Sequence, residues 1–366
     1  MSHEIRTVTA VGARKAIQKC FAKKRPIFLW GPPGIGKSDL VQQVVDSGEL
    51  GNAYMIDMRL ALMEPTDLRG YPFRNPDTNQ MEWAPAVDLP TEELASAYDT
   101  IVLFLDELNS APPSVQAAAY QLVLNGKIGQ YELPNNVKIV AAGNRETDRG
   151  VTYRMPAPLA NRFRHINMDV NFEDWSFWAT ENKVHQDVIG YLTYSKADLF
   201  DFDPKTSSQS FATPRSWSFV SEILNTEGFD TASDFEQKAE IAGAIGEGMA
   251  IKFCEHRKIA SKLPNPEDVL TGKVKKLDIK EKSAQYSFAI GLCYELATLS
   301  ENGSEKDFDK GVDFFFDFIM ANFEPELVIF SAKTVLSDHD IDIKPRKLQG
   351  KKEFKDRYWK YLFPTS

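Results

Sequence analysis

The segment 31–38, GPPGIGKS, constrains the fold of this chain more than any other feature. It matches the pattern G-x-x-x-x-G-K-[ST] and lies between an apolar run, Ile27–Trp30, and a stretch at 40–45 with apolar residues at helical spacing. Its glycines allow successive N–H groups to point toward phosphate oxygens, and the helix N-terminus adds the positive end of its dipole. We therefore predict a strand, a phosphate-binding loop and a helix. The predicted binding residues are Gly31, Pro32, Pro33, Gly34, Ile35, Gly36, Lys37 and Ser38.

Short β-branched runs alternate with helical stretches from Pro26 to about Val170, which is typical of parallel βα units. Several of the runs are almost wholly apolar, as in strands that are covered on both faces. We predict an α/β fold with a five-stranded parallel sheet, a helix from Ser110 through Leu124 that Gly126 closes, and a hairpin over 126–136. The predicted strands are 27–30, 54–58, 101–105, 137–142 and 165–170.

Two carboxylates, Asp106 and Glu107, follow the apolar run at 101–105. A carboxylate at the end of a buried strand can hold Mg²⁺ through water, and its neighbour can polarise an attacking water molecule. Ser38 can ligate the same ion, and Lys37 can reach the β- and γ-phosphates. Asn144, after the run at 137–142, can orient water or contact the γ-phosphate without adding charge. We therefore expect nucleotide hydrolysis, with Ser38 and Asp106 as metal ligands and Glu107 and Asn144 in catalysis.

Several motifs together resemble the MoxR branch of the AAA+ ATPases, and the resemblance covers roughly residues 8–224. The motifs are GPPGIGKS, FLDE, AAGN, LANRF at 159–163 and TPRSW at 213–217. The resemblance implies an AAA+ core that binds ATP and Mg²⁺, with Asn144 as sensor 1 and Arg215 as sensor 2. It implies that Arg162 is the arginine finger offered to the ATP of a neighbouring subunit, with Arg164 as a rival. A guanidinium suits this role because its planar donors match charge spread over a transferring phosphoryl group.

The resemblance also implies partners. It implies a homo-oligomer, a hexameric ring, that remodels a protein client or inserts a metal or cofactor into it. MoxR-like proteins commonly work with a von Willebrand factor A domain, and this chain lacks the D-x-S-x-S motif of such a domain, so the partner would be a separate chain. The segment 58–72 resembles a loop near the central pore, with Asp67 and Arg69 as candidates for client or partner contact. The client, the ring stoichiometry and the need for ATP in assembly stay open.

The length of 366 residues predicts more than one domain. We predict a nucleotide-binding α/β domain over 1–170, a helical lid with sensor 2 over 171–260, and a mainly helical C-terminal extension over 261–366. The extension ends in a basic tail at 344–360 whose role stays open. The net charge is −9, which gives no general attraction to nucleic acid.

The cysteines Cys20, Cys254 and Cys293 are widely separated, which predicts reduced core thiols and neither a metal site nor a disulfide framework. Neither a signal-peptide pattern nor an apolar run of membrane-spanning length is seen, so we expect a cytoplasmic protein without a membrane partner.

Two other functions remain as alternatives. A nucleic-acid motor or loader is conceivable because many AAA+ relatives pull DNA through a pore, although the acidic composition disfavours it. A nucleotide-gated scaffold would bind ATP without hydrolysing it, and the pair Asp106 and Glu107 disfavours this. A GTPase is set aside because the guanine-reading pattern N-K-x-D is missing and its nearest imitation, at 182–185, ends in His185.

Overall fold

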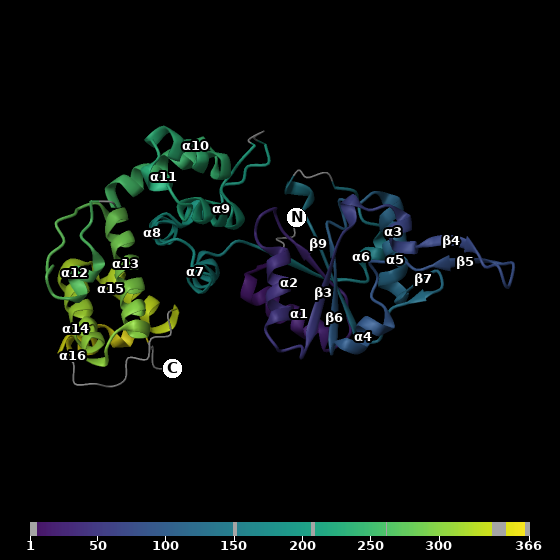
Figure 1. Ribbon diagram of the computed structural model, residues 1–366, viewed down its shortest axis with the longest axis horizontal. Coiled ribbons are helices and arrows are strands. Elements are labelled where there is room, and N and C mark those ends of the chain that lie inside the picture. The colour runs from purple at the N-terminus through teal and green to yellow at the C-terminus, as the bar shows by residue number, and fades with distance from the viewer. Residues whose placement is uncertain (1–5, 149–151, 206–208, 261, 339–348, 363–366) are drawn as a thin grey trace. The chain divides into compact units, whose positions relative to one another are not determined.

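The computed structural model describes residues 6–148, 152–205, 209–260, 262–338 and 349–362. It divides into two compact units, which are described separately below (Figure 1). Unit 1 comprises Met1–Asn171 with Asp203–Ser207, and unit 2 comprises Phe172–Phe202 with Ser208–Ser366. No helix of the described ranges has both the length and the apolar character that crossing a membrane requires.

A six-stranded parallel sheet forms the centre of unit 1, with the order β1-β10-β2-β9-β6-β3. The strands are β1 (Thr7–Val8), β10 (Arg164–Met168), β2 (Ile27–Trp30), β9 (Val137–Gly143), β6 (Thr100–Asp106) and β3 (Ala53–Arg59). The predicted α/β fold is confirmed, and each predicted strand is present with bounds that differ by at most two residues. The edge strand β1 was not predicted, because two residues are too few to show a periodic pattern.

Helices cover both faces of this sheet. On one face, α1 (Ala10–Phe21) and α2 (Lys37–Asp46) form a core with Ile27 and Leu29 of β2. On the other face, α5 (Pro113–Asn125) and α6 (Ala157–Ala160) pack with Phe28 of the same strand. Neighbouring residues of β2 therefore point into two different apolar layers, which explains why its sequence is a continuous apolar run.

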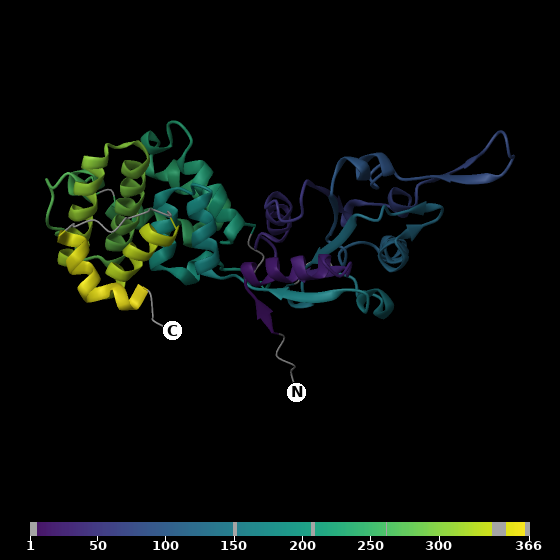
Figure 2. The same cartoon turned by 90° about the horizontal axis from the view of Figure 1, so that it is seen from below.

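Two hairpins and several short helices complete unit 1. The hairpin β4–β5 projects from the body of the unit in both views (Figures 1 and 2), and the hairpin β7–β8 lies within the predicted range 126–136. The segment 58–72 is not a plain loop, because two short helices precede the first hairpin. The bounds are η1 (Leu60–Leu62), α3 (Pro65–Arg69), β4 (Tyr71–Arg74), β5 (Met81–Ala84), α4 (Glu92–Ala97), β7 (Lys127–Ile128), β8 (Tyr131–Glu132) and η2 (Glu146–Asp148).

Helices make up the secondary structure of the described part of unit 2. They are α7 (Phe172–Glu181), α8 (Gln186–Tyr194), η3 (Lys196–Leu199), α9 (Pro214–Leu224), η4 (Phe229–Thr231), α10 (Asp234–Ile245), α11 (Glu247–Ala260), α12 (Pro266–Leu270), α13 (Lys282–Asn302), α14 (Glu305–Asn322), α15 (Pro325–Lys333), the π-helical turn η5 (Thr334–Asp338) and α16 (Gln349–Leu362). One apolar core of this unit lies between α12, α13, α14, α15 and α16. Helix α8 crosses α13 closely, since a Cβ added to Gly190 would lie 2.5 Å from Oγ of Ser287. Parts of the predicted lid and of the predicted extension thus pack within one unit, and the boundary near residue 260 stays a prediction.

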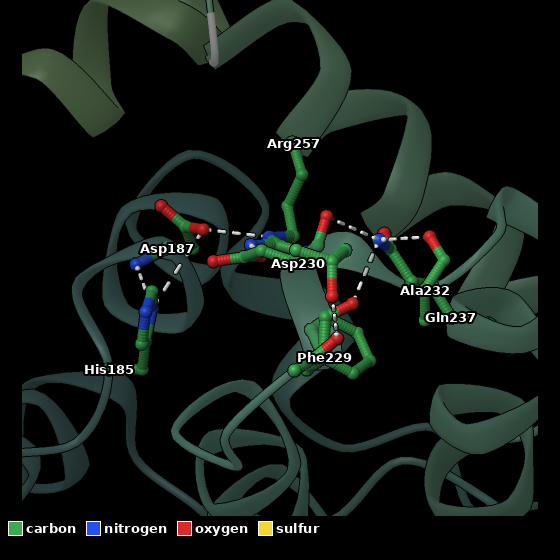
Figure 3. A network of polar contacts seen from close by, with 9 residues as sticks. His185, Asp187, Phe229, Asp230, Ala232, Gln237 and Arg257 are labelled. Atoms are coloured by element: carbon green, nitrogen blue, oxygen red, sulfur yellow. Dashed lines mark hydrogen bonds and ion pairs between the residues drawn. The ribbon is translucent and has the colours of Figure 1, made fainter.

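A polar network joins four segments of unit 2, α8, η4, α10 and α11 (Figure 3). Arg257 of α11 donates from Nε to Oδ2 of Asp187 on α8 over 2.7 Å and from Nη2 to Oδ1 of Asp230 on η4 over 3.0 Å. The amide of Gln237 donates to the carbonyl oxygen of Phe229 over 3.0 Å. The network borders a cavity of ≈ 630 Å³, and the charged residues that line this cavity pair with one another. We therefore assign the network to the stability of the helical unit. The three cysteines are buried, and none of them forms a disulfide, as predicted.

Candidate functional site

The loop at 31–36 joins β2 to α2, and two of its glycines adopt backbone conformations that other residues avoid. Gly34 and Gly36 have φ angles of 76° and 81°. The left-handed region costs glycine little because glycine has no Cβ. The N–H of Gly31 donates to the carbonyl oxygen of Gly143 over 3.3 Å, which ties the loop to the end of β9. The strand, loop and helix predicted from the sequence are therefore present.

Lys37, the first residue of α2, is only 9% exposed. Its Nζ donates to the carbonyl oxygens of Gly31 and Pro32 over 2.7 and 2.9 Å and to Oδ1 of Asn144 over 3.2 Å. Burial of an ammonium group is costly unless its donors find acceptors, and these oxygens supply them. The fold thus brings Lys37 and Asn144, which are 107 residues apart in the chain, into direct contact.

Ser38 and Asp106 form a pair of oxygen ligands beside this lysine. The hydroxyl of Ser38 donates to Oδ2 of Asp106 over 3.4 Å. Neighbouring ligands of Mg²⁺ lie about 3 Å apart, because the ion requires octahedral geometry with bonds of roughly 2.0–2.1 Å. The two side chains therefore fit the predicted metal-ligand pair. Within the described ranges, no group of three or more His, Cys, Asp or Glu side chains could hold a metal ion by itself.

A further carboxylate, Asp57 of β3, lies close to this pair, and sequence reasoning missed it. Burial raises the pKa of Asp57, the charge of Asp106 raises it further, and Arg59 lowers it in part. Carboxylates that lie close together favour a bound cation, which relieves their repulsion. The available signal was a charged residue inside the otherwise apolar run at 54–58.

Glu107 follows Asp106 directly and has an unusual backbone. Its φ angle is 55°, and its side chain is exposed. Its N–H donates to Oδ1 of Asp106 over 2.9 Å. A residue with a Cβ is disfavoured in the left-handed region, and such outliers cluster at functional sites. The strained turn places a carboxylate in solvent at the end of β6, next to the predicted metal ligand.

Asn109 is a second residue that sequence reasoning missed. It is 2% exposed, and its Nδ2 donates to the carbonyl oxygen of Asn144 over 2.7 Å. A Cβ added to Gly143 would lie 2.0 Å from Oδ1 of Asn109, so only glycine fits beside it. Asn109 therefore fixes the backbone that presents Asn144, and it lies in the same turn as Glu107. No motif in the sequence marks this contact.

The turn with Arg162 and Arg164 lies at the amino-terminal ends of the strands, whereas the loop at 31–36 lies at their carboxyl ends. Strands β10 and β2 are parallel, and Arg164 pairs with Ile27, the first residue of β2, whereas the loop follows the last residue. Arg164 directs Nη1 to Sγ of Cys20 at 3.9 Å. Arg162 is exposed, and its side chain makes neither a hydrogen bond nor an ion pair with any described residue. The structure thus does not bring either arginine to the loop of its own unit.

Three other predicted residues lie on α9 and α3. Arg215 is exposed in the first turn of α9, in unit 2. A cation at a helix N-terminus opposes the helix dipole, so helix stability does not explain it. On α3, Asp67 accepts the N–H of Glu64 over 2.8 Å and caps the helix, whereas Arg69 is exposed.

Residues 26–163 match the family model described as the AAA domain, dynein-related subfamily. The matched segment contains β2, the loop at 31–36, β6, β9 and Arg162. The match supports an AAA domain in unit 1. It does not identify the MoxR branch, so membership of that branch stays a prediction.

Among solved structures, NtrX of Brucella abortus in complex with ADP is similar at a TM-score of 0.40 and 14% identity, covering 81% of this chain and 67% of that chain. A mutant RuvB of Thermotoga maritima is similar at a TM-score of 0.34 and 16% identity, covering 68% of this chain and 72% of that chain. Similarities at these scores carry no argument about function.

Proposed function

We propose that this chain is an ATPase whose unit 1 binds ATP with Mg²⁺ and hydrolyses it. The observation that carries the proposal is that Lys37, Ser38, Asp106 and Asn144 converge at the carboxyl ends of the neighbouring strands β2, β6 and β9. In open α/β sheets, ligands bind at the carboxyl ends of the strands. The match of residues 26–163 to the AAA domain supports the same function.

Each residue of the cluster has one role in this proposal. Lys37 and the N–H groups of the loop hold the phosphates, whose oxygens replace the acceptors that Lys37 now contacts. Ser38 and Asp106 hold Mg²⁺, which neutralises negative charge on the phosphates. Glu107 accepts a hydrogen bond from the attacking water and polarises it. Asn144 orients that water or the γ-phosphate.

The opposite position of Arg162 supports a shared site in a homo-oligomer. An exposed guanidinium far from its own loop can serve the loop of a neighbouring subunit, where it stabilises the charge of the transferring phosphoryl group. We assign Arg162 as this finger in preference to Arg164, whose guanidinium lies against Cys20. Arg215 acts as the sensor of unit 2, and the assembly is a hexameric ring.

The hairpin β4–β5 supports a role in remodelling a protein client. Tyr71 is 62% and Met81 is 64% exposed, and the strand pairing places them on opposite faces of the hairpin. A two-stranded hairpin is marginally stable by itself. Contact with another chain would bury these apolar side chains and would thereby stabilise the hairpin. We assign the client contact to this hairpin, with Asp67 and Arg69 on the helix that precedes it. A von Willebrand factor A domain protein is the proposed separate partner, and the proteins that co-purify with a slow-hydrolysing Glu107→Gln form identify the client.

The Lys37→Ala variant tests the proposed nucleotide site. We expect it to lose ATP binding, because Lys37 supplies the cation of the loop, which contacts the β- and γ-phosphates in nucleotide sites of this pattern. Titration with a fluorescent ATP analogue measures the affinity, and circular dichroism verifies the fold. Undiminished affinity in a folded variant would contradict the assigned site.

A further inference from the structure

His165 makes two hydrogen bonds that join distant parts of unit 1. The indole N–H of Trp30 donates to Nδ1 of His165 over 2.8 Å, and Nε2 of His165 lies 2.8 Å from the carbonyl oxygen of Ala160. An indole can only donate and a carbonyl can only accept, so Nδ1 carries no hydrogen and Nε2 carries one. A single neutral tautomer of His165 therefore satisfies both partners.

The two partners lie next to the two parts of the proposed catalytic machinery. Trp30 is the last residue of β2 and directly precedes the loop at 31–36. Ala160 is the last residue of α6, and Arg162 follows two residues later. His165 thus connects the strand that leads into the phosphate loop with the turn that carries the proposed finger.

Aromatic packing restricts the orientation of the His165 ring. Trp30 stacks on Phe28 with a centroid distance of 4.2 Å and an interplanar angle of 27°, and it stacks on His165 at 5.9 Å and 28°. The buried Phe163 meets Phe28 edge-on at 5.4 Å and 83°. Because Phe163 is the neighbour of Arg162, the same cluster anchors the finger turn directly.

We propose that His165 is a positioning residue, which holds the turn at 160–163 so that Arg162 of one subunit reaches the ATP of the next. This proposal rests on the proposed function, in which Arg162 acts on a neighbouring subunit. His165 acts through the turn and not by contact with the nucleotide. Its loss should therefore lower the turnover rate while leaving the ATP affinity of its own subunit unchanged.

Two substitutions of His165 separate hydrogen bonding from ring packing. His165→Phe keeps a flat ring and removes both hydrogen bonds, whereas His165→Gln has an amide with both an acceptor and a donor. Misplaced catalytic groups and lost supporting contacts cost about 10- to 10²-fold, so we expect this loss of turnover for His165→Phe. We expect His165→Gln to recover most of the rate. Trp30→Phe removes the indole donor and part of the stacked ring but leaves the contact of His165 with Ala160. It should therefore give a smaller loss, and it provides a second route if His165→Phe does not fold.

Mixing experiments show which site His165 serves. In mixtures with Lys37→Ala, which keeps an intact finger, His165→Phe subunits should regain turnover, because the neighbour supplies a correctly placed Arg162 to their intact loops. In mixtures with Arg162→Ala, they should not regain it, because each interface then has either no finger or a misplaced one. The mixture of Arg162→Ala with Lys37→Ala is the control for the shared site, and native mass spectrometry verifies mixed assemblies.

Three results would overturn the proposal. Recovery with Arg162→Ala but not with Lys37→Ala would show that His165 acts through Trp30 on its own loop. Wild-type turnover of His165→Phe would remove His165 from positioning altogether. Failure of the control mixture would overturn the shared site and this inference with it, whereas failure of the His165 mixtures alone leaves the proposed function intact.

Discussion

At the scale of single residues, Glu107 has a backbone conformation that its side chain does not favour. A residue with a Cβ in the left-handed region costs roughly 1–2 kcal/mol, and Glu107 has a φ angle of 55°. The N–H of Glu107 also donates to Asp106, so the turn that carries the strain orients the proposed metal ligand. We interpret the strain as a consequence of placing a carboxylate where water is to be polarised.

Glu107→Gln and Glu107→Gly separate catalysis from strain. We expect both to bind ATP and to lower turnover by roughly 10²-fold or more, because a positioned base contributes on this scale. Glycine within a helix or strand lowers the free energy of unfolding by about 0.5–1 kcal/mol relative to alanine, but at this position it also relieves backbone strain. We therefore expect the free energy of unfolding of Glu107→Gly to equal or exceed that of Glu107→Gln. Single-turnover kinetics and urea unfolding measure the two effects. Wild-type turnover in Glu107→Gln would assign the base to another carboxylate.

The sequence predicts residues that belong to a contiguous motif, and it misses contacts between motifs. Lys37 and Ser38 were expected beside Asp106 because the loop motif at 31–38 and the acidic pair after the strand at 101–105 both predict groups that hold a phosphate-bound Mg²⁺. Asn109 and His165 act through a backbone carbonyl and an indole, and such partners leave no mark in the local sequence. The functional roles of all these residues stay predictions until they are tested.

At the scale of elements, Gly70 determines how the hairpin β4–β5 leaves the body of unit 1. It joins α3 to β4 with a φ angle of 80°, and an added Cβ would lie 1.8 Å from the carbonyl oxygen of Ala84. That oxygen belongs to the backbone at the end of β5, so it cannot move without displacing the hairpin.

Gly70→Ala and Gly48→Ala provide a matched pair that tests this role. Gly48 has a φ angle of 74°, and a Cβ added there meets no atom within 4 Å. We expect Gly48→Ala to lower the free energy of unfolding by about 1–2 kcal/mol through backbone strain alone. Gly70→Ala should cost more and should expose the hairpin to limited proteolysis. Equal effects of the two substitutions would show that the close approach is readily relieved.

A buried histidine in helix α11 should make the stability of unit 2 depend on pH. His256 is 5% exposed, and burial lowers its pKa from 6.5 to about 4, with a partial opposing effect of Asp187. Between these values the unfolded chain binds a proton that folded His256 does not, so the free energy of unfolding falls as the pH decreases. Above pH 6.5 the two states do not differ at this group.

The free energy of unfolding falls by up to about 3 kcal/mol by pH 4, because each unit of the pKa difference between the folded and unfolded states corresponds to about 1.36 kcal/mol. His256→Gln cannot take up the proton and keeps a partner for Ser287, whose Oγ lies 2.7 Å from Nε2 of His256. Hydrogen exchange of α11 amides between pH 7 and pH 4 measures the local stability. An equally steep loss of stability in His256→Gln would show that another group causes the pH dependence.

The elements of unit 1 were predicted more completely than those of unit 2, for a physical reason. Strands buried on both faces give continuous apolar runs, and Pro113 and Gly126 mark the ends of α5. In unit 2, the sequence predicted mainly helical segments over 171–366 but not which helices pack together. Packing such as that of Gly190 on Ser287 depends on residues far apart in the chain, and no single segment encodes it.

At the scale of the whole molecule, the proposed mechanism requires an assembly in which one subunit completes the site of another. Within unit 1, the proposed finger lies at the amino-terminal ends of the strands and the loop lies at their carboxyl ends, as the pairing of Arg164 with Ile27 shows. In a single copy, the phosphate-binding loop therefore has no arginine finger beside it, and Arg162 has no nucleotide site within reach in its own unit.

The measurement that tests this claim most directly is the ATP turnover of mixed assemblies. Arg162→Ala should bind ATP normally and lose about 10³- to 10⁵-fold in turnover, and Lys37→Ala should not bind ATP. When the two variants are combined, Arg162→Ala loops that face Lys37→Ala fingers should recover part of the wild-type rate. Native mass spectrometry verifies that the assemblies contain both variants. No recovery in verified mixed assemblies, or full activity of a verified monomer, would contradict the shared site.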